Sequence, residues 1–281
     1  MGDVGKLLRE IYAEWQADEA LALGAALAYY TIFAMAPLLV LVIALAGLAL
    51  GRAAAEGQLV GQIASLVGES GAHAIQDMIS RASTPKAGIV ASLVSVAAMT
   101  LGATGVFGQL QHALNKIWNA PPPRRRGLRA HVRKRAVAFG MILGIGFLLL
   151  VSLAISAALA AVHELLARHA PFASRLLPLL NFALSFAVIT ALFALIFKVL
   201  PDVDMGWGDV LPGGAVTALL FTVGKTLIGL YLGRAGMTSV YGAAGSFVLV
   251  LLWVYYSAQI LLLGAEFTEV YSRRYGSRLA R

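Results

Sequence analysis

The chain of 281 residues is 59% hydrophobic and only 13% charged, whereas globular domains are about 45–50% apolar and about 25% charged. This composition excludes an ordinary soluble domain and indicates a protein that uses lipid as its solvent. The absence of cysteine excludes disulfides, thiolate metal sites and iron–sulfur clusters. The net charge of +8 matters through its distribution, because basic residues decide membrane orientation.

The chain opens with a predicted amphipathic helix and a long apolar span. Apolar residues recur at helical spacing over residues 4–15, together with Lys and Arg, which predicts a helix in the inner membrane interface. No charged residue occurs between Glu19 and Arg52. This run exceeds the roughly 20 residues that a membrane-spanning helix needs, so we predict the first span at residues 22–50. Pro37 near its middle favours a kink.

The predicted outer loop at residues 52–86 contains two short apolar faces, one around Ile63 and one around Ile75. Gly68 and Gly71 separate them, which predicts two short amphipathic helices. Two interpretations remain open. The helices pack on the outer ends of the spans, which we favour, or they lid a cavity or touch lipid headgroups.

Five further apolar runs complete the predicted membrane domain. Each is longer and more continuous than the alternating segments of about 10 residues that build a membrane β-barrel. We therefore predict an all-α, polytopic membrane protein with six transmembrane helices and short amphipathic interfacial helices, forming one membrane domain over residues 1–281. The later spans are predicted at residues 87–114, 136–162, 176–197, 207–233 and 240–267.

Basic residues are distributed unevenly between the predicted loops. The loop at residues 115–135 carries eight of the 22 Lys and Arg residues, which places it in the cytoplasm under the positive-inside rule. With the two termini and the loop between the fourth and fifth spans, the inner side holds 15 basic residues and the outer side six. Both termini are therefore predicted to be cytoplasmic.

The arginines of this cytoplasmic loop allow more than one interpretation. They could contact RNA phosphates or anionic lipid headgroups, and the favoured interpretation is that they fix topology. The loop offers no interleaved aromatic residues to stack bases, which disfavours nucleic acid as a partner. The candidate contacts with anionic lipid are Arg124, Arg125, Arg126 and Arg129.

Lys225 is the central residue of a candidate substrate path. It lies 18 residues after Trp207, about 27 Å along a helix, which places it in the outer third of the bilayer, where its stem can snorkel to water. A charge inside a span is a candidate functional group. Interhelical hydrogen bonding explains the other polar groups of the path equally well. These further path candidates are Tyr29, Tyr30, Pro37, Asn115, Tyr231, Tyr241 and Gly242.

Two acidic residues are predicted at the inner face of the membrane. Asp209 begins the fifth span and Glu266 ends the sixth, so both can pair with basic residues of the tail or the loops. The five histidines are scattered without metal-binding spacing, and no pair of carboxylates forms a clear aqueous site. We therefore predict no catalytic residues, no metal and no cofactor.

Several stretches resemble the YihY/BrkB family of bacterial inner-membrane proteins. They occur in the family's order over nearly the whole chain, with a minor departure at Ala34 and Ala36, where family members often carry Ser. The stretches are ALAYYTIFAMAPLL at residues 26–39, GQLQHALNKIW at 108–118, Pro201 with Trp207, Asp209, Pro212 and Gly213, Lys225 with Tyr231 and Tyr241-Gly242, and Trp253 with Tyr255 and Leu263-Gly264-Ala265-Glu266.

This resemblance implies a six-span protein of the bacterial inner membrane. The family carries an old ribonuclease BN label, a link by name to serum-resistance virulence factors, and a suspected role in moving lipids. RNA hydrolysis needs positioned acid, base or metal groups, and the basic loop offers arginines instead, so we expect no enzyme. We expect a transporter, or a protein that translocates lipids or other amphiphiles between its helices. The alternative is a non-transporting scaffold of an envelope complex. The expected partners are the bilayer and its anionic headgroups. The protein partners considered are a second copy of this chain and another envelope protein.

Overall fold

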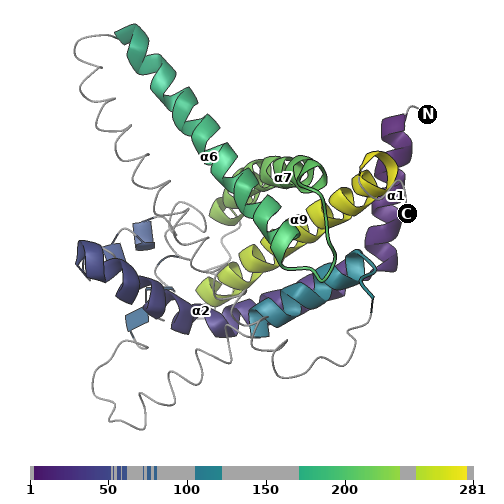
Figure 1. Ribbon diagram of the computed structural model, residues 1–281. Coiled ribbons are helices and arrows are strands. Elements are labelled where there is room, and N and C mark those ends of the chain that lie inside the picture. The colour runs from purple at the N-terminus through teal and green to yellow at the C-terminus, as the bar shows by residue number, and fades with distance from the viewer. Residues whose placement is uncertain are drawn as a thin grey trace. The chain divides into compact units, whose positions relative to one another are not determined.

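A computed structural model shows a chain built from helices, with no strand in the described part. The structure describes residues 3–51, 105–121, 171–234 and 245–276, and between them residues 53, 56, 57, 59–61, 72, 75, 76, 79 and 80. Residues 105–117 are helical. The longer helices are α1 (Asp3–Ala17), α2 (Ala20–Leu50), α6 (Pro171–Val199), α7 (Trp207–Arg234) and α9 (Gly245–Tyr275) (Figure 1). The predicted all-α class is confirmed.

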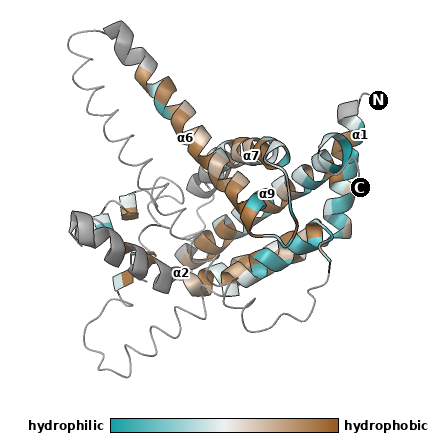
Figure 2. Ribbon diagram, in the orientation of Figure 1, coloured by the Kyte–Doolittle hydropathy of each residue, from teal (hydrophilic) through white to brown (hydrophobic). Residues whose placement is uncertain are grey.

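Three of the described helices are long and apolar enough to cross a membrane. They contain the segments Leu177–Val199, Trp207–Ile228 and Phe247–Tyr275, and their hydrophobic character is visible along α6, α7 and α9 (Figure 2). These segments coincide with the last three predicted spans, and α2 coincides with the first. The predicted span at residues 136–162 lies outside the described residues, as does the part of the second span before residue 105.

The junction between α1 and α2 follows from local backbone chemistry. α1 ends at Ala17, and Glu19 adopts a positive φ of 56°, a conformation common where helices end. The backbone N–H groups of Ala22 and Leu23 then donate to the Glu19 carbonyl and start α2. α2 stays helical through Pro37.

The chain divides into two compact units. Unit 1 comprises Met1–Asp18, Leu114–Thr222 and Leu261–Arg281, and unit 2 comprises Glu19–Ala113 and Val223–Ile260. The two units share α7 and α9, because each of these helices contributes one part to each unit.

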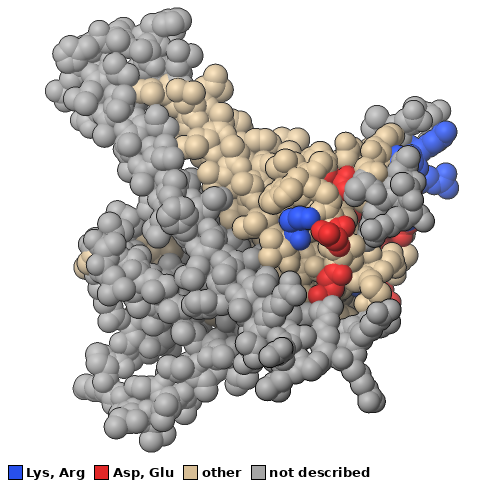
Figure 3. Space-filling view, in the orientation of Figure 1, with Lys and Arg blue, Asp and Glu red and all other residues tan. Residues whose placement is uncertain are grey.

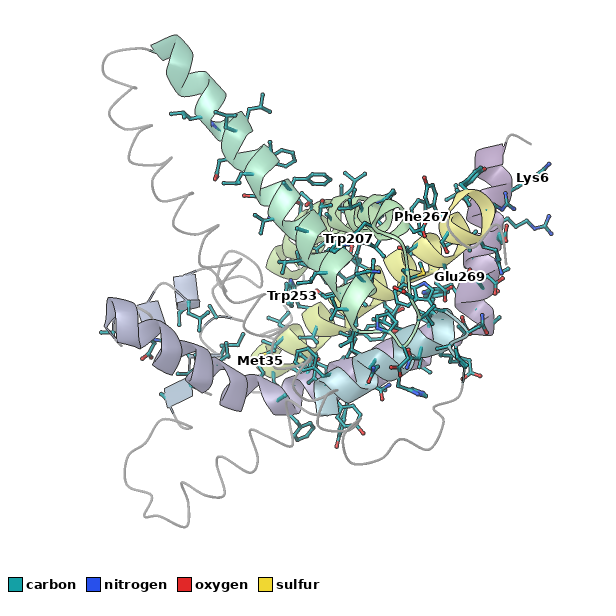
Figure 4. The ribbon with its side chains drawn as sticks, in the orientation of Figure 1. Lys6, Met35, Trp207, Trp253, Phe267 and Glu269 are labelled. Carbon is teal, nitrogen blue, oxygen red and sulfur yellow. The ribbon has the colours of Figure 1, made fainter. Side chains whose placement is uncertain are left out.

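Unit 2 is built around aliphatic side chains from α2, α9 and the predicted outer loop. Ile75 and Ile79 of that loop are buried among them, whereas Gly68 and Gly71 lie outside the described residues. Met35 and Trp253 lie against this core (Figure 4). The buried core residues are Ala28, Ile32, Ile43, Ile75, Ile79, Val250 and Val254.

In unit 1, glycine and threonine alternate where α7 meets α9. A Cβ added at Gly213 would lie 1.9 Å from the Thr268 hydroxyl oxygen, and one added at Gly264 would lie 1.9 Å from that of Thr217. Each threonine donates its hydroxyl hydrogen to the carbonyl of the glycine four residues earlier, Thr217 to Gly213 at 2.7 Å and Thr268 to Gly264 at 2.6 Å. The two helices therefore run antiparallel here and approach as closely as small residues permit.

A neighbouring face of α7 packs closely on α6. A Cβ added at Gly214 would lie 2.6 Å from the Thr190 carbonyl oxygen. Next to this contact, the rings of Trp118 and Phe197 meet edge to face, with centroids 5.7 Å apart. Both rings are fully buried and form part of the core of unit 1.

Candidate functional site

Glu266 is a buried carboxyl group near the C-terminal end of α9. The residue is 1% exposed, and neither of its carboxyl oxygens has a hydrogen-bond partner within the described residues. It follows Gly264 by two residues, so it points away from the glycine–threonine contact with α7. The predicted pairing of Glu266 with a basic residue of the tail is not formed in the part of the chain that is described.

The nearest basic residue of the tail is engaged with other carboxylates. The Arg273 guanidinium contacts Glu10 at 2.7 Å, Glu14 at 3.0 Å and Glu269 at 3.7 Å, and Arg274 also pairs with Glu10. α1 is thereby fastened to the end of α9. Glu269 lies on α9 in this region (Figure 4). Charged side chains of both signs are visible on this side of the described surface, whereas the described part of α6 before Lys198 shows none (Figure 3).

Asp209 occupies the first turn of α7 and is 3% exposed. Its carboxyl oxygen lies close to the last turn of α9, since a Cβ added at Gly276 would lie 2.0 Å from it. A negative charge at the N-terminal end of a helix is stabilised by the helix dipole. Asp209 and Glu266, the two predicted inner-face charges, therefore both belong to unit 1.

Asn115 joins the end of its helix to the connection between α6 and α7. Its side-chain amide donates to an Asp202 carboxyl oxygen at 3.2 Å, and the Asp202 backbone N–H donates to the Asn115 side-chain oxygen at 2.8 Å. In the same connection Lys198 pairs with Asp204 at 2.9 Å and also donates to the Met205 carbonyl. The amide of Asn115, a candidate path residue, thus holds a turn in unit 1.

Lys225 lies on the part of α7 that belongs to unit 2 and is half-buried. Within the described residues no ion pair involves its ammonium group. The preceding residue, Gly224, faces Tyr256 of α9, whose hydroxyl oxygen would lie 2.2 Å from an added Cβ. α7 therefore packs tightly on α9 at the residue immediately before Lys225.

The other path candidates are only partly brought together. Tyr29 and Tyr30 are exposed at 59% and 42%, and the Tyr30 ring lies against Gly105. No hydrogen bond, ion pair or ring contact joins either tyrosine to Lys225 among the residues described. The side chains of Pro37 and Tyr231 lie outside the described structure, as do the whole residues Tyr241, Gly242, Arg124, Arg125, Arg126 and Arg129.

Sequence reasoning missed two features of unit 1. One is the reciprocal contact of Gly213 and Gly264 with threonines. Its signal in the sequence is weak: a glycine one helical turn before a threonine on each of two predicted spans. The attachment of α1 to α9 has a clearer signal, acidic residues at positions 10 and 14 and an Arg-Arg pair at positions 273 and 274. As for metals, the described residues contain no group of three or more His, Asp or Glu side chains that could hold one.

Comparison with known proteins places this arrangement among membrane proteins. A family model described as virulence factor BrkB matches residues 11–281. A UPF0761 membrane protein of Rhodospirillum centenum is 28% identical over 94% of this chain and 57% of its own length. A UPF0761 membrane protein of Pseudomonas aeruginosa is 30% identical over 88% of this chain and 58% of its own length. One of Azotobacter vinelandii is 31% identical over 92% of this chain and 61% of its own length.

The chain thus spans about three fifths of the length of these relatives. No solved structure matches it. The family match covers all of the elements described above except the first residues of α1. The chain is an integral membrane protein, and it belongs to the BrkB virulence-factor family.

Proposed function

We propose that this protein translocates a lipid or another amphiphile with an anionic group across the bacterial inner membrane, along a path between its helices. The observation that supports this function is Lys225, a half-buried lysine inside an apolar helix, with no ion-pair partner in the described residues. A lysine in a span is costly and is usually retained for function.

The position of Lys225 suits an anionic headgroup. Its long side chain can reach from the helix toward the membrane surface while its aliphatic stem stays in an apolar environment. An ammonium group is a strong hydrogen-bond donor to phosphate. A phospholipid headgroup passing along this side of α7 would therefore meet a cation in the outer third of the bilayer, before it reaches the centre, where its own charge is most costly.

The alternative function, a scaffold of an envelope complex, is favoured by the dense glycine–threonine packing of unit 1. Closely packed helices with no room for a polar path are what a static membrane anchor requires. The two functions differ in one measurable property, because only a translocating protein changes the rate at which lipids cross the bilayer.

Lipid movement in reconstituted vesicles tests the proposal. The full chain is placed in vesicles with a trace of phosphatidylglycerol that carries a fluorophore in its headgroup region, and an impermeant reductant bleaches the outer leaflet. We expect the protein to expose inner-leaflet probe faster than protein-free vesicles do. Lys225→Gln should slow this exposure by about tenfold, equivalent to roughly 1.4 kcal/mol, whereas Lys225→Arg should retain most of it.

Lys198→Gln is the matched control, since Lys198 is a lysine near a helix end that is already paired with Asp204. It should leave the rate unchanged. Equal bleaching with and without protein would contradict translocation and favour the scaffold. If the Lys225→Gln protein exposed the probe as fast as the wild type does, Lys225 would not be part of the path.

A further inference from the structure

Glu266 is an ionisable group that the proposed function does not use. Its carboxyl group is sealed from water at 1% exposure, and neither oxygen accepts or donates a hydrogen bond within the described structure. Leaving an ionised carboxylate buried and uncompensated costs several kcal/mol. The same group carries no charge when it holds a proton, and its burial is then far less costly.

The charges around Glu266 add to this cost. Glu14 of α1, Asp18 of the α1–α2 link and Glu269 of α9 all act on it with negative charge, and Arg273 acts with positive charge. The Arg273 guanidinium is already shared among three carboxylates. A further negative charge at Glu266 would therefore be repelled by more groups than attract it.

Two other charged groups face this region from neighbouring helices. Lys116, next to Asn115, acts on Asp18, and Asp209 of α7 lies against the last turn of α9. Neither forms a hydrogen bond with the Glu266 carboxyl group. A metal ion is a poor candidate ligand, because no group of three or more potential metal-binding side chains occurs in the described residues.

We propose that Glu266 is a proton-binding site, occupied in this packed arrangement of unit 1 and able to exchange its proton when the α1–α2 link moves away from α9. On release, the proton passes to water that enters the opened junction, and a carboxylate remains. A last role rests on the proposed function: Glu266 supplies the proton whose movement is coupled to translocation of the lipid.

Chemical modification tests the proton site without any transport assay. Dicyclohexylcarbodiimide is an apolar reagent that adds to protonated carboxyl groups: the acid oxygen bonds to the carbodiimide carbon, the acid proton moves to nitrogen, and an acyl shift gives a stable acylurea with no leaving group. The full chain in lipid vesicles is treated over a pH series. Peptide mass spectrometry then locates the adduct and measures its yield.

We expect the adduct on Glu266 in the wild-type protein, with a yield that falls about tenfold per pH unit once the carboxyl ionises. Glu266→Gln should lose the adduct. Glu269→Gln is the matched control, because Glu269 is also buried on α9 but is ion-paired with Arg273, and this variant should keep the adduct on Glu266.

Two results would overturn the proposal. One is modification of Glu269, Glu14 or Asp18 in preference to Glu266. The other is an unmodified Glu266 in mildly acidic buffer while circular dichroism shows intact helices. A pH-dependent adduct on Glu266 in a protein that moves no lipid would uphold the proton site and reject only the proposed function.

Discussion

At the scale of single residues, the glycines between α7 and α9 carry a clear stability prediction. Gly264→Ala places a methyl group 1.9 Å from the Thr217 hydroxyl oxygen and 2.8 Å from the Thr217 Cβ, so the helices must separate. We expect a loss of about 1–3 kcal/mol, seen as a lower thermal unfolding midpoint in detergent. Adding Thr217→Ala should recover part of that loss, because the clash is pairwise.

Gly108→Ala is the control for this substitution, since nothing lies within 4 Å of a Cβ added at Gly108. Alanine is the better helix former, so this variant should unfold at the wild-type temperature or above it. A Gly264→Ala protein with an unchanged midpoint would show that the two helices have room to spare.

Asp18 gives a prediction that depends on pH. Burial raises the pKa of its carboxyl above the ordinary 3.8, Lys116 opposes this rise and Glu14 adds to it. Between pH 3.8 and the raised pKa, the folded chain holds a proton that the unfolded chain has released, so stability falls as pH rises through this window and stays lower above it. Asp18→Asn should flatten that slope in unfolding titrations and stabilise the protein at neutral pH. The exposed neighbour offers a control, Glu19→Gln, which should keep the slope.

At the scale of elements, the ion pairs that fasten α1 to α9 can be released. Arg273→Gln removes the contacts with Glu10, Glu14 and Glu269. Partly exposed pairs are each worth about 0.2–1 kcal/mol, so we expect amide hydrogen exchange over α1 to quicken by about 5–30-fold. Added salt should produce a similar change in the wild type.

Lys6→Gln serves as the comparison for Arg273→Gln. Lys6 is exposed on α1, the helix whose exchange is measured, and its side chain points away from α9 (Figure 4). Its exchange pattern should match the wild type. If Arg273→Gln left the exchange of α1 unaltered, apolar contacts such as buried Ile11 would be what holds the helix.

Long uncharged runs made most elements predictable from the sequence. α2, α6 and α7 begin and end within about five residues of the predicted spans. α9 continues to Tyr275, eight residues beyond the predicted end at 267, because its charged last turns are paired with α1 and need not leave the helix. Composition locates where apolar sequence stops, and only tertiary contacts decide where the helix stops.

The candidate site was less predictable than the helices. Glu266 could be named because it is an acidic residue at the end of an apolar run. Its lack of partners could not be predicted, because it depends on Arg273 pairing with Glu10 and Glu14, which are 263 and 259 residues away in the sequence. Likewise, the hydrogen bonds of Asn115 could not be predicted, because their partner, Asp202, lies 87 residues away in the sequence.

At the scale of the whole molecule, the predicted orientation is open to direct labelling. The chain has no cysteine, so single cysteines can be introduced without background. With an impermeant maleimide, Gly57→Cys in the outer loop should react in right-side-out membrane vesicles, and Arg126→Cys in the basic loop should react only in inverted ones. Reaction of Arg126→Cys in right-side-out vesicles would reverse the predicted topology.

The glycine–threonine contact also limits how unit 1 can move. Gly213 opposes Thr268 and Gly264 opposes Thr217, so slipping α7 by one helical turn along α9 would set Thr217 against Thr268, where one partner must lack a side chain. Axial sliding between these two helices is therefore blocked in that direction. Opening of unit 1 along this face therefore requires α7 and α9 to separate, to rotate, or to slide the other way, which would set Gly213 against Gly264.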